Sequence, residues 1–226
     1  MKNNIIKNYL DTQKNFFEDT HHLMVPNNHY VHNQDPEYWD ILLKEIKSEP
    51  KKWENKRALD FGCGCGRNLV NLSTLANWET IDGCDISKQN AEYSKKWFEE
   101  NKGFSKSLAK TWENNGIDIQ PTEENYYDFI MSHIVFQHIS NYDVRYAIIK
   151  DMYKSIKPNG LVSLHFMDLE VGTSYHDKCI EFKNCRVDNP EFLIKDFEKI
   201  GFKNVTCEVG SDYFTKLKSY YIKGTK

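Results

Sequence analysis

Three glycines at alternate positions follow an acidic residue in the segment Asp60-Phe61-Gly62-Cys63-Gly64-Cys65-Gly66. The apolar residues 57–61 at its start predict a β-strand, and the apolar spacing within 69–76 after it predicts a helix. Because glycine has no Cβ, such a turn lets a ligand lie against the backbone beneath the helix N-terminus. The segment therefore predicts a binding turn for an organic cofactor.

Two features of this turn discriminate between cofactor classes. Dinucleotide-binding turns have the spacing Gly-x-Gly-x-x-Gly, and here Arg67 stands where the third glycine belongs. The sequence also lacks the Gly-Lys-Ser/Thr of a Walker phosphate loop. The carboxylate of Asp60 would repel a pyrophosphate and attract a cation such as S-adenosylmethionine (SAM), which carries an ammonium and a sulfonium. SAM is therefore favoured, and an NAD-dependent oxidoreductase stays as an alternative.

A second acidic residue, Asp85, lies 19 residues beyond Gly66 at the end of the predicted strand 80–84. An acid at this place can bind the hydroxyls of a ribose. It also stands at the start of a predicted helix, 87–100, for which Ser87 is a suitable cap. Both roles are compatible, and neither separates SAM from NAD.

Strand and helix signals alternate from residue 57 onward, which predicts a Rossmann-like α/β fold with helices on both faces of a mostly parallel sheet. The last two strands are joined without a helix, so they are expected to form an antiparallel hairpin. Residues 1–50 are rich in Asn, His and aromatics, and we expect them to be an N-terminal helical cap on a cofactor-binding domain, 51–226. The seven expected strands are 57–61, 80–84, 107–111, 127–132, 161–166, 203–209 and 218–223.

The glycine-rich segment resembles motif I of the class I SAM-dependent methyltransferases. Further segments are similar to that family's motifs in the order in which the family has them, and together they extend from Trp53 to the C-terminus. Asn159 replaces the first glycine of the family's Leu-Lys-Pro-Gly-Gly turn. The similar segments are Gly83–Ser87, Tyr127–Ile139, Ile156–Leu161 and Glu191–Phe202.

The resemblance implies which residues would bind the cofactor. The glycine turn would line the methionine end of SAM, the residues after the second strand would bind ribose and adenine, and the end of the fourth strand would flank the sulfonium. By position these residues are Asp60, Gly62, Gly64, Gly66, Arg67 and Asn68; then Asp85, Ile86, Asn115, Gly116 and Ile117; then Ser132, His133 and Val135.

Three histidines are candidate catalytic bases, because imidazole can accept a proton from a hydroxyl or amine near neutral pH. His138 lies one turn beyond the fourth predicted strand, His133 lies at its end, and His165 ends the fifth strand beside Asp168. For His138 the sequence slightly favours the alternative of a purely structural role, in packing or hydrogen bonding. Methyl transfer from SAM needs positioning more than acid–base chemistry, so the sequence names the cofactor better than the acceptor.

The cap and the segment 168–189 are free to build the acceptor pocket, for which we expect a small molecule such as a sugar, an amine or a lipid or metabolite precursor, methylated on O or N. A protein or RNA acceptor and a non-catalytic SAM-binding subunit are the alternatives. The candidate pocket residues are Tyr9, His29, Tyr30, Trp39, Tyr175, His176 and Arg186.

Composition and sequence features disfavour several other functional classes for this protein. The formal net charge of −3 gives no electrostatic basis for binding nucleic acid. The sequence has no apolar run of about 20 residues and no signal-like start, so we expect a cytoplasmic protein with no membrane partner, monomeric or homodimeric. Its six cysteines show no Cys-x-x-Cys pair, and we expect reduced thiols and no metal. The histidines at 21, 22, 29 and 32 lack the spacing of helical metal ligands.

Overall fold

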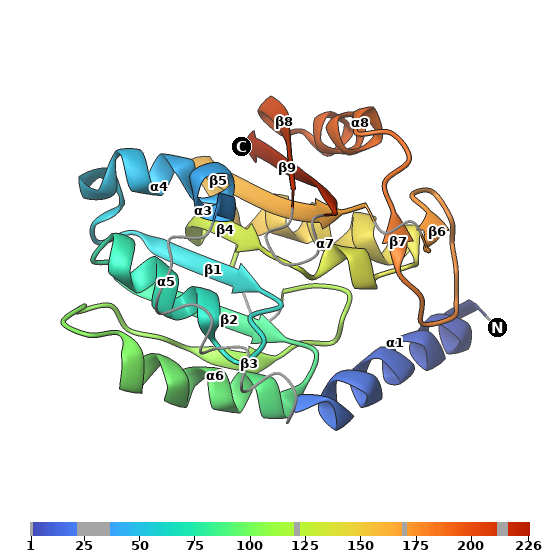
Figure 1. Cartoon of the computed structure of the whole chain (residues 1–226), viewed down its shortest axis with the longest axis horizontal. Coiled ribbons are helices and arrows are strands. Elements are labelled where there is room, and N and C mark those ends of the chain that lie inside the picture. The colour runs from blue at the N-terminus through green and yellow to red at the C-terminus, as the bar shows by residue number, and fades with distance from the viewer. Residues whose placement is uncertain (1, 22–36, 120–122, 169–170, 212–216) are drawn as a thin grey trace.

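The computed structural model describes residues 2–21, 37–119, 123–168, 171–211 and 217–226 (Figure 1). Helices and strands alternate through most of the chain, as the sequence predicts. The helices are α1 (Lys2–Asp19), α3 (Glu37–Leu42), α4 (Lys44–Ser48), α5 (Arg67–Leu75), α6 (Lys88–Asn101), α7 (Tyr142–Ser155) and α8 (Glu191–Ile200), with single 3-10 turns η2 (Pro50–Trp53) and η3 (Phe136–His138). The strands are β1 (Arg57–Phe61), β2 (Thr80–Asp85), β3 (Thr111–Glu113), β4 (Tyr127–Ser132), β5 (Ile156–Met167), β6 (Thr173–Ser174), β7 (Cys185–Arg186), β8 (Lys203–Ser211) and β9 (Lys218–Thr225).

Seven of these strands form one sheet in the order β3-β2-β1-β4-β5-β9-β8. The pairs from β3 to β5 are parallel, whereas β9 runs antiparallel to both β5 and β8. The strand order reverses between β1 and β4, and ligands of open α/β sheets bind at the carboxyl ends of the strands beside such a point. The predicted mostly parallel sheet with a C-terminal antiparallel hairpin is confirmed.

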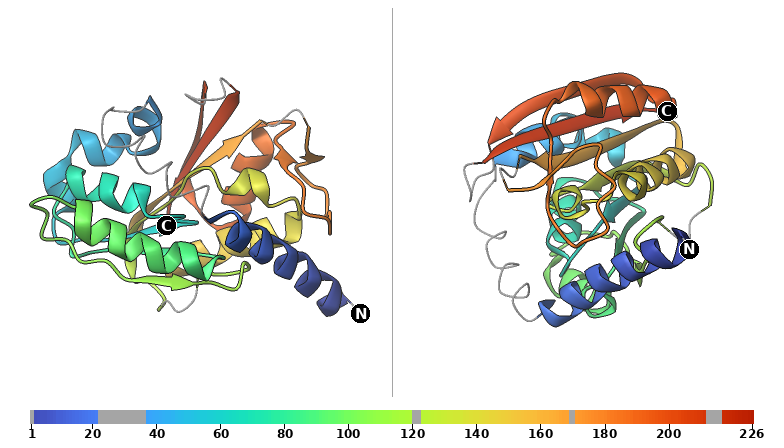
Figure 2. Two further views of the ribbon diagram at one scale, coloured as in Figure 1. Left: turned by 60° about the horizontal axis from the view of Figure 1, so that its bottom comes forward. Right: turned by 90° about the vertical axis from the view of Figure 1, so that its right-hand side faces the viewer.

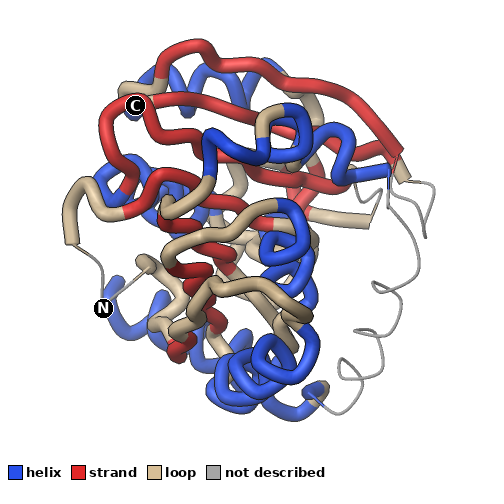
Figure 3. Tube along the Cα trace, turned by 90° about the vertical axis from the view of Figure 1, so that its left-hand side faces the viewer, coloured by secondary structure: helices blue, strands red, loops and turns tan. Residues whose placement is uncertain are grey.

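Helices lie on both faces of this sheet (Figures 2 and 3). An apolar core of buried side chains lies on each face. Successive strand residues alternate between them, as the pleat requires: Leu59 packs with the core under α7 and α8, and Ala58 with the core under α4, α5 and α6. Both faces of the sheet are therefore covered by helices, and this explains why the central strands consist mostly of apolar residues.

Two predicted strand boundaries are wrong by several residues. The third strand is Thr111–Glu113 rather than 107–111, because pairing with β2 starts at Gly83↔Thr111 and Leu108 makes only an isolated bridge. The fifth strand begins before its predicted turn, at Ile156, which pairs with Tyr127 across a bulge. Within that bulge Asn159 has a left-handed φ of 64°, which asparagine tolerates better than most residues.

The short helices α3 and α4 are fastened to the sheet by polar contacts. The ammonium of Lys223 on β9 is only 4% exposed and lies 2.8 Å from a carboxylate oxygen of Glu45; it also donates to the carbonyl of Ile41. Ser163 on β5 donates to the carbonyl of Leu42 at 2.8 Å. In the described part of the chain, no helix is long and apolar enough to cross a membrane.

Replacing Glu45 by Gln is expected to lower the free energy of unfolding by about 1–3 kcal/mol, because it leaves a buried ammonium without its counter-charge. The lower end allows for Glu45 being partly exposed. Urea unfolding followed by tryptophan fluorescence measures the change. The control is Asp40→Asn, which removes the exposed partner of Lys47 and is expected to change the free energy by less than about 0.5 kcal/mol. An equal loss of unfolding free energy in the two variants would contradict the role of the Glu45–Lys223 ion pair in holding α4 against the sheet.

Candidate active site

The glycine-rich turn joins β1 to α5 at the carboxyl end of the sheet. Gly62, Gly64 and Gly66 all have positive φ, of 72°, 50° and 94°. A Cβ on Gly62 would lie 2.3 Å from a methyl carbon of Val135, and one on Gly66 would lie 2.7 Å from the carbonyl oxygen of Ser94. Conformation and space thus both require glycine at positions 62 and 66.

The turn is held by its neighbour β2. The backbone N–H groups of Gly62 and Cys63 donate to the carbonyl of Cys84, at 2.7 and 3.0 Å. The N–H of Gly64 donates to the carboxylate of Asp85 at 2.9 Å. The glycine turn and Asp85 are therefore in direct contact, although 21 residues separate Gly64 from Asp85 in the sequence.

The carboxylate of Asp60 is fully buried, and neither of its oxygens has a hydrogen-bond partner among the residues that the structure describes. Burial raises the pKa of Asp60 to about 8; the guanidinium of Arg67 opposes this rise and the charge of Asp85 adds to it. A buried carboxyl without a partner is costly in the ligand-free protein. Asp60 does not line the cavity described below.

Asp85 has most of its hydrogen-bonding capacity in use. In addition to Gly64, it accepts from the N–H of Ser87 at 2.9 Å and from the side chain of Asn90 at 3.3 Å. Ser87 in turn caps α6 by accepting from the N–H of Asn90. A carboxylate has about four lone-pair sites, so Asp85 retains the capacity to accept one more donor. Burial raises the pKa of Asp85, and the donated N–H groups oppose that rise.

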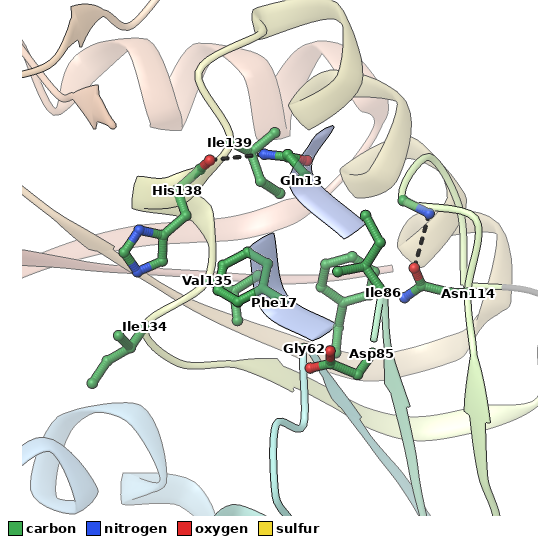
Figure 4. A pocket seen from close by; sticks show the side chains of 12 residues that line it. Gln13, Phe17, Gly62, Asp85, Ile86, Asn114, Ile134, Val135, His138 and Ile139 are labelled. Carbon is green, nitrogen blue, oxygen red and sulfur yellow. Dashed lines mark hydrogen bonds between the residues drawn. The ribbon is translucent and has the colours of Figure 1, made fainter. Parts of the chain in front are cut away.

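A cavity opens beside Asp85, between the sheet edge and α1 (Figure 4). Val135, Ile134 and His138 form one side and Ile86 and Asn114 the other, with Phe17 of α1 across the opening. The full lining is Gln13, Phe17, Phe61, Gly62, Asp85, Ile86, Asn114, Gly116, Ile134, Val135, His138 and Ile139.

Of the three cofactor contacts predicted after β3, Gly116 lines this cavity and the other two do not. Asn114 and Gly116 line the cavity, whereas Asn115 and Ile117 line a neighbouring open cavity beside α1. Asn114 is fixed by its N–H bond to the carbonyl of Asp85 at 2.8 Å, and its side chain accepts from the N–H of Gly116. Gly116 has a φ of 77°. No motif marks Asn114, so only its pairing beside β2 reveals it.

Gln13 and Phe17 were also missed, since α1 carries no motif that points to a site. The helix is fixed on both sides of the cavity. Gln13 donates to the carbonyl of His138 at 2.8 Å, and the carboxylate of Glu18 accepts from the N–H of Lys88 at the start of α6, at 2.6 Å. Lys14 forms an ion pair with Glu113. α1 therefore roofs the cavity.

The three candidate histidines lie in different surroundings. His138 lines the cavity. His165 is fully buried, and both ring nitrogens are engaged, one by the N–H of Ile134 at 3.2 Å and the other by the Ser219 hydroxyl at 3.0 Å. His133 contacts the Arg67 guanidinium at 3.1 Å, and burial, His165 and Arg67 hold the pKa of His133 well below its usual range. Neither His133 nor His165 lines the cavity.

Two further residues that were predicted to contact the cofactor form hydrogen bonds within the protein instead of lining the cavity. Ser132 is buried and donates to the carbonyl of Phe61 at 2.8 Å, which ties β4 to β1. Asn68 is buried in the first turn of α5 and accepts from the side chain of Asn71. Neither lines the cavity.

The candidate acceptor residues are only partly described. Tyr9 is buried, and its hydroxyl accepts from Gln13 at 2.9 Å. Tyr175 donates to Asp196 at 2.8 Å, and His176 packs on Phe192. Arg186 pairs with Asp188, so its charge is already compensated. Positions 22, 29, 30 and 32, and the side chain at 39, lie outside the described residues, whereas His21 contacts Asn90 at 2.7 Å.

Comparisons with known proteins agree with this geometry. A family model described as "Methyltransferase domain" matches residues 30–207. An uncharacterized protein of Rickettsia prowazekii (strain Madrid E) is 28% identical over 136 residues, which are 59% of this chain and 52% of that relative; the chain thus matches about half of the relative's length.

Solved structures share the fold. A SAM-dependent methyltransferase of Methanosarcina mazei has a TM-score of 0.62 at 15% identity, over 78% of this chain and 96% of that one. Phosphoethanolamine N-methyltransferase 2 of Haemonchus contortus, in complex with phosphomonomethylethanolamine and S-adenosylhomocysteine, has a TM-score of 0.55 at 14% identity, over 81% and 52%.

Asp60→Asn is expected to stabilise the ligand-free protein in a pH-dependent way. Because the pKa of Asp60 is raised to about 8 in the folded state, the folded protein binds a proton that the unfolded chain has already lost. Stability contributed by this group therefore falls as pH rises from about 4 to about 8. The variant should melt several degrees higher at pH 8, about 2–4 °C per kcal/mol regained, with little change at pH 4. Melting temperatures are measured by calorimetry, with the exposed substitution Glu92→Gln as the control. A difference in melting temperature between Asp60→Asn and the unaltered protein that does not depend on pH would contradict the raised pKa of Asp60.

Proposed function

The chain belongs to the methyltransferase family, and on that premise we propose that it transfers the methyl group of SAM to an oxygen or nitrogen of a small-molecule acceptor. The observation that carries the choice of donor is the buried, unpartnered carboxylate of Asp60 directly before the glycine turn. SAM supplies an already activated methyl group on a sulfonium and also carries an ammonium. The ammonium would give the Asp60 carboxylate a hydrogen-bond donor and would add its positive charge to that of Arg67.

The residues around the cavity fit the other end of the cofactor. Asp85 lines the cavity and has room for one more donor, so it would accept one ribose hydroxyl while it continues to hold Gly64. Ile86, Asn114 and Gly116 lie on the same side and offer an apolar surface with one amide for adenine. Gly62 also lines the cavity, and its lack of a Cβ leaves room for Val135 against the turn.

The roof formed by α1 supports a lid role for the N-terminal cap, residues 1–50. Phe17 and Gln13 close the cavity from above, and exclusion of water strengthens the electrostatic contacts within it. A roof that encloses the site suits a small acceptor better than a macromolecule, and the net charge of −3 disfavours nucleic acid.

His138 is the best-placed candidate base among the three histidines, because it lines the cavity. Burial lowers the pKa of His138, and its contact with Asn184 opposes that change. The imidazole is therefore neutral at pH 7 and can accept a proton from an acceptor hydroxyl or amine. His133 and His165 would support the sheet edge rather than exchange protons.

Isothermal titration calorimetry with S-adenosylhomocysteine, the demethylated product, tests the donor assignment. We expect binding at pH 7 with release of up to about one proton, because a bound ammonium lowers the raised pKa of Asp60. Titrations in buffers of different ionisation enthalpy measure that proton. Asp60→Asn should abolish the release, and both Asp60→Asn and Asp85→Ala should weaken binding by about 10- to 100-fold through the loss of charged hydrogen bonds.

The two assignments fail separately in this titration. No heat with the product, together with binding of NADH, would favour the oxidoreductase alternative. Unchanged affinity in Asp85→Ala would refute the ribose role alone. Exposed Glu92→Gln serves as the matched carboxylate control and should bind as the unaltered protein does.

The acceptor class is tested by following labelled methyl groups. The protein is incubated with methyl-labelled SAM and a cell extract, and the product is separated by size. We expect label in the small-molecule fraction because α1 roofs the cavity, and at least tenfold less label with Asp85→Ala. Label that precipitates with protein or RNA instead would overturn the small-molecule assignment.

A further inference from the structure

The ring of His138 is held by a residue that no motif marks. Its Nδ1 lies 3.1 Å from the side-chain oxygen Oδ1 of Asn184, 46 residues further along the chain. Asn184 directly precedes β7, and its carbonyl accepts from the backbone N–H of Thr173 at 2.9 Å and from the Thr173 hydroxyl at 3.3 Å. The side chain that meets His138 is therefore anchored through its own backbone to β6.

We propose that Asn184 is a positioning residue that fixes His138 as the Nδ1–H tautomer, leaving Nε2 as the nitrogen that can accept a proton. An amide oxygen only accepts hydrogen bonds, so the ring nitrogen facing it must carry the proton. The tautomer of a histidine is set by the hydrogen bond that its other nitrogen makes. This inference rests on the proposed function for its catalytic meaning, and not for the tautomer itself.

A second contact is consistent with the same tautomer. The amide nitrogen of Gln137 lies 3.4 Å from His138 Nε2. An amide NH₂ group only donates, so Nε2 faces it with its lone pair. At 3.4 Å this bond is long, and a hydroxyl or amine of an acceptor can displace it. The Asn184 contact is shorter and is held from outside the cavity lining, so it persists when the Gln137 contact is lost.

The remaining neighbours fix the ring without adding a charge. Phe17 of α1 meets it edge-on, with ring centroids 6.0 Å apart. The backbone is held in η3 by the bond from His138 N–H to the carbonyl of Val135 at 2.9 Å, and its carbonyl accepts from Gln13. Phe17, Gln13, Gln137 and Asn184 are all uncharged, so the Asn184 oxygen is the polar group that decides which nitrogen is protonated.

Nitrogen-15 NMR of the full chain labelled at histidine tests the proposal, because long-range proton–nitrogen spectra distinguish the two tautomers. The His138 signals are identified by their loss in His138→Gln. We expect the Nδ1–H form in the unaltered protein. In Asn184→Leu, which keeps a similar volume but cannot accept, only the long contact with Gln137 at 3.4 Å still favours that form, and we expect a shift toward the Nε2–H form that predominates for free histidine in water. Exposed Asn8→Leu on α1 is the matched control and should change nothing.

Asn184→Asp provides an independent measurement if the leucine variant fails to fold. A carboxylate in place of the amide should keep the Nδ1–H form and raise the pKa of His138 by about 1 or more in an NMR titration. The Nε2–H form in the unaltered protein, an unchanged tautomer in Asn184→Leu, or an unchanged pKa in Asn184→Asp would each overturn the proposal.

Calorimetry with S-adenosylhomocysteine separates this proposal from the proposed function. Asn184 does not line the cavity, so the leucine variant should bind the product within about twofold of the unaltered protein. If the unaltered protein does not bind the product while its tautomer is as expected, the donor assignment fails and the positioning of His138 stands. If it binds the product and the tautomer is wrong, only the positioning role fails.

Discussion

The glycine turn after β1 depends on the parallel pairing of β1 with β2 and β4. That pairing brings the carbonyl of Cys84 and the carboxylate of Asp85 to the N–H groups of the turn. It also places Val135, which follows β4, so close to Gly62 that no Cβ fits between them. The turn is therefore a rigid feature set by three strands, and the cavity beside it takes its shape from that constraint.

Two buried carboxyl groups at the same edge of the sheet destabilise the folded protein when they are charged. Asp60 and Asp85 are both buried there; burial raises the pKa of both carboxyls, and the charge of Asp85 raises the pKa of Asp60 further. Asp85 accepts hydrogen bonds from backbone and side-chain donors. The oxygens of Asp60 have no hydrogen-bond partner within the described part of the chain. A protein tolerates an unpaired buried carboxyl where a ligand completes it, and sites of this kind trade stability for function.

The N-terminal helix completes the site with side chains unrelated to the family motifs. Its Glu18 caps α6 on one side of the cavity, and Gln13 holds the carbonyl of His138 on the other. A carboxylate at a helix N-terminus is a favourable arrangement, so α1 is held by the same helix that begins beside Asp85. The roof formed by α1 and the carboxylate of Asp85 are thereby linked through α6.

The sequence by itself determined the strand–turn–helix around Gly62–Gly66, the acids at positions 60 and 85, and the mostly parallel sheet, because these follow from local glycine chemistry and apolar periodicity. Only the tertiary structure decided that His138 lines the cavity while both ring nitrogens of His165 are engaged, and that Asn114 rather than Asn115 lies at its wall. It also decided that Phe17 lines the cavity and that Asn184 contacts His138. Those outcomes depend on contacts between segments far apart in the chain. Neither periodicity nor motif spacing encodes such contacts, since they arise only when the sheet edge, α1 and the segment before β7 pack together.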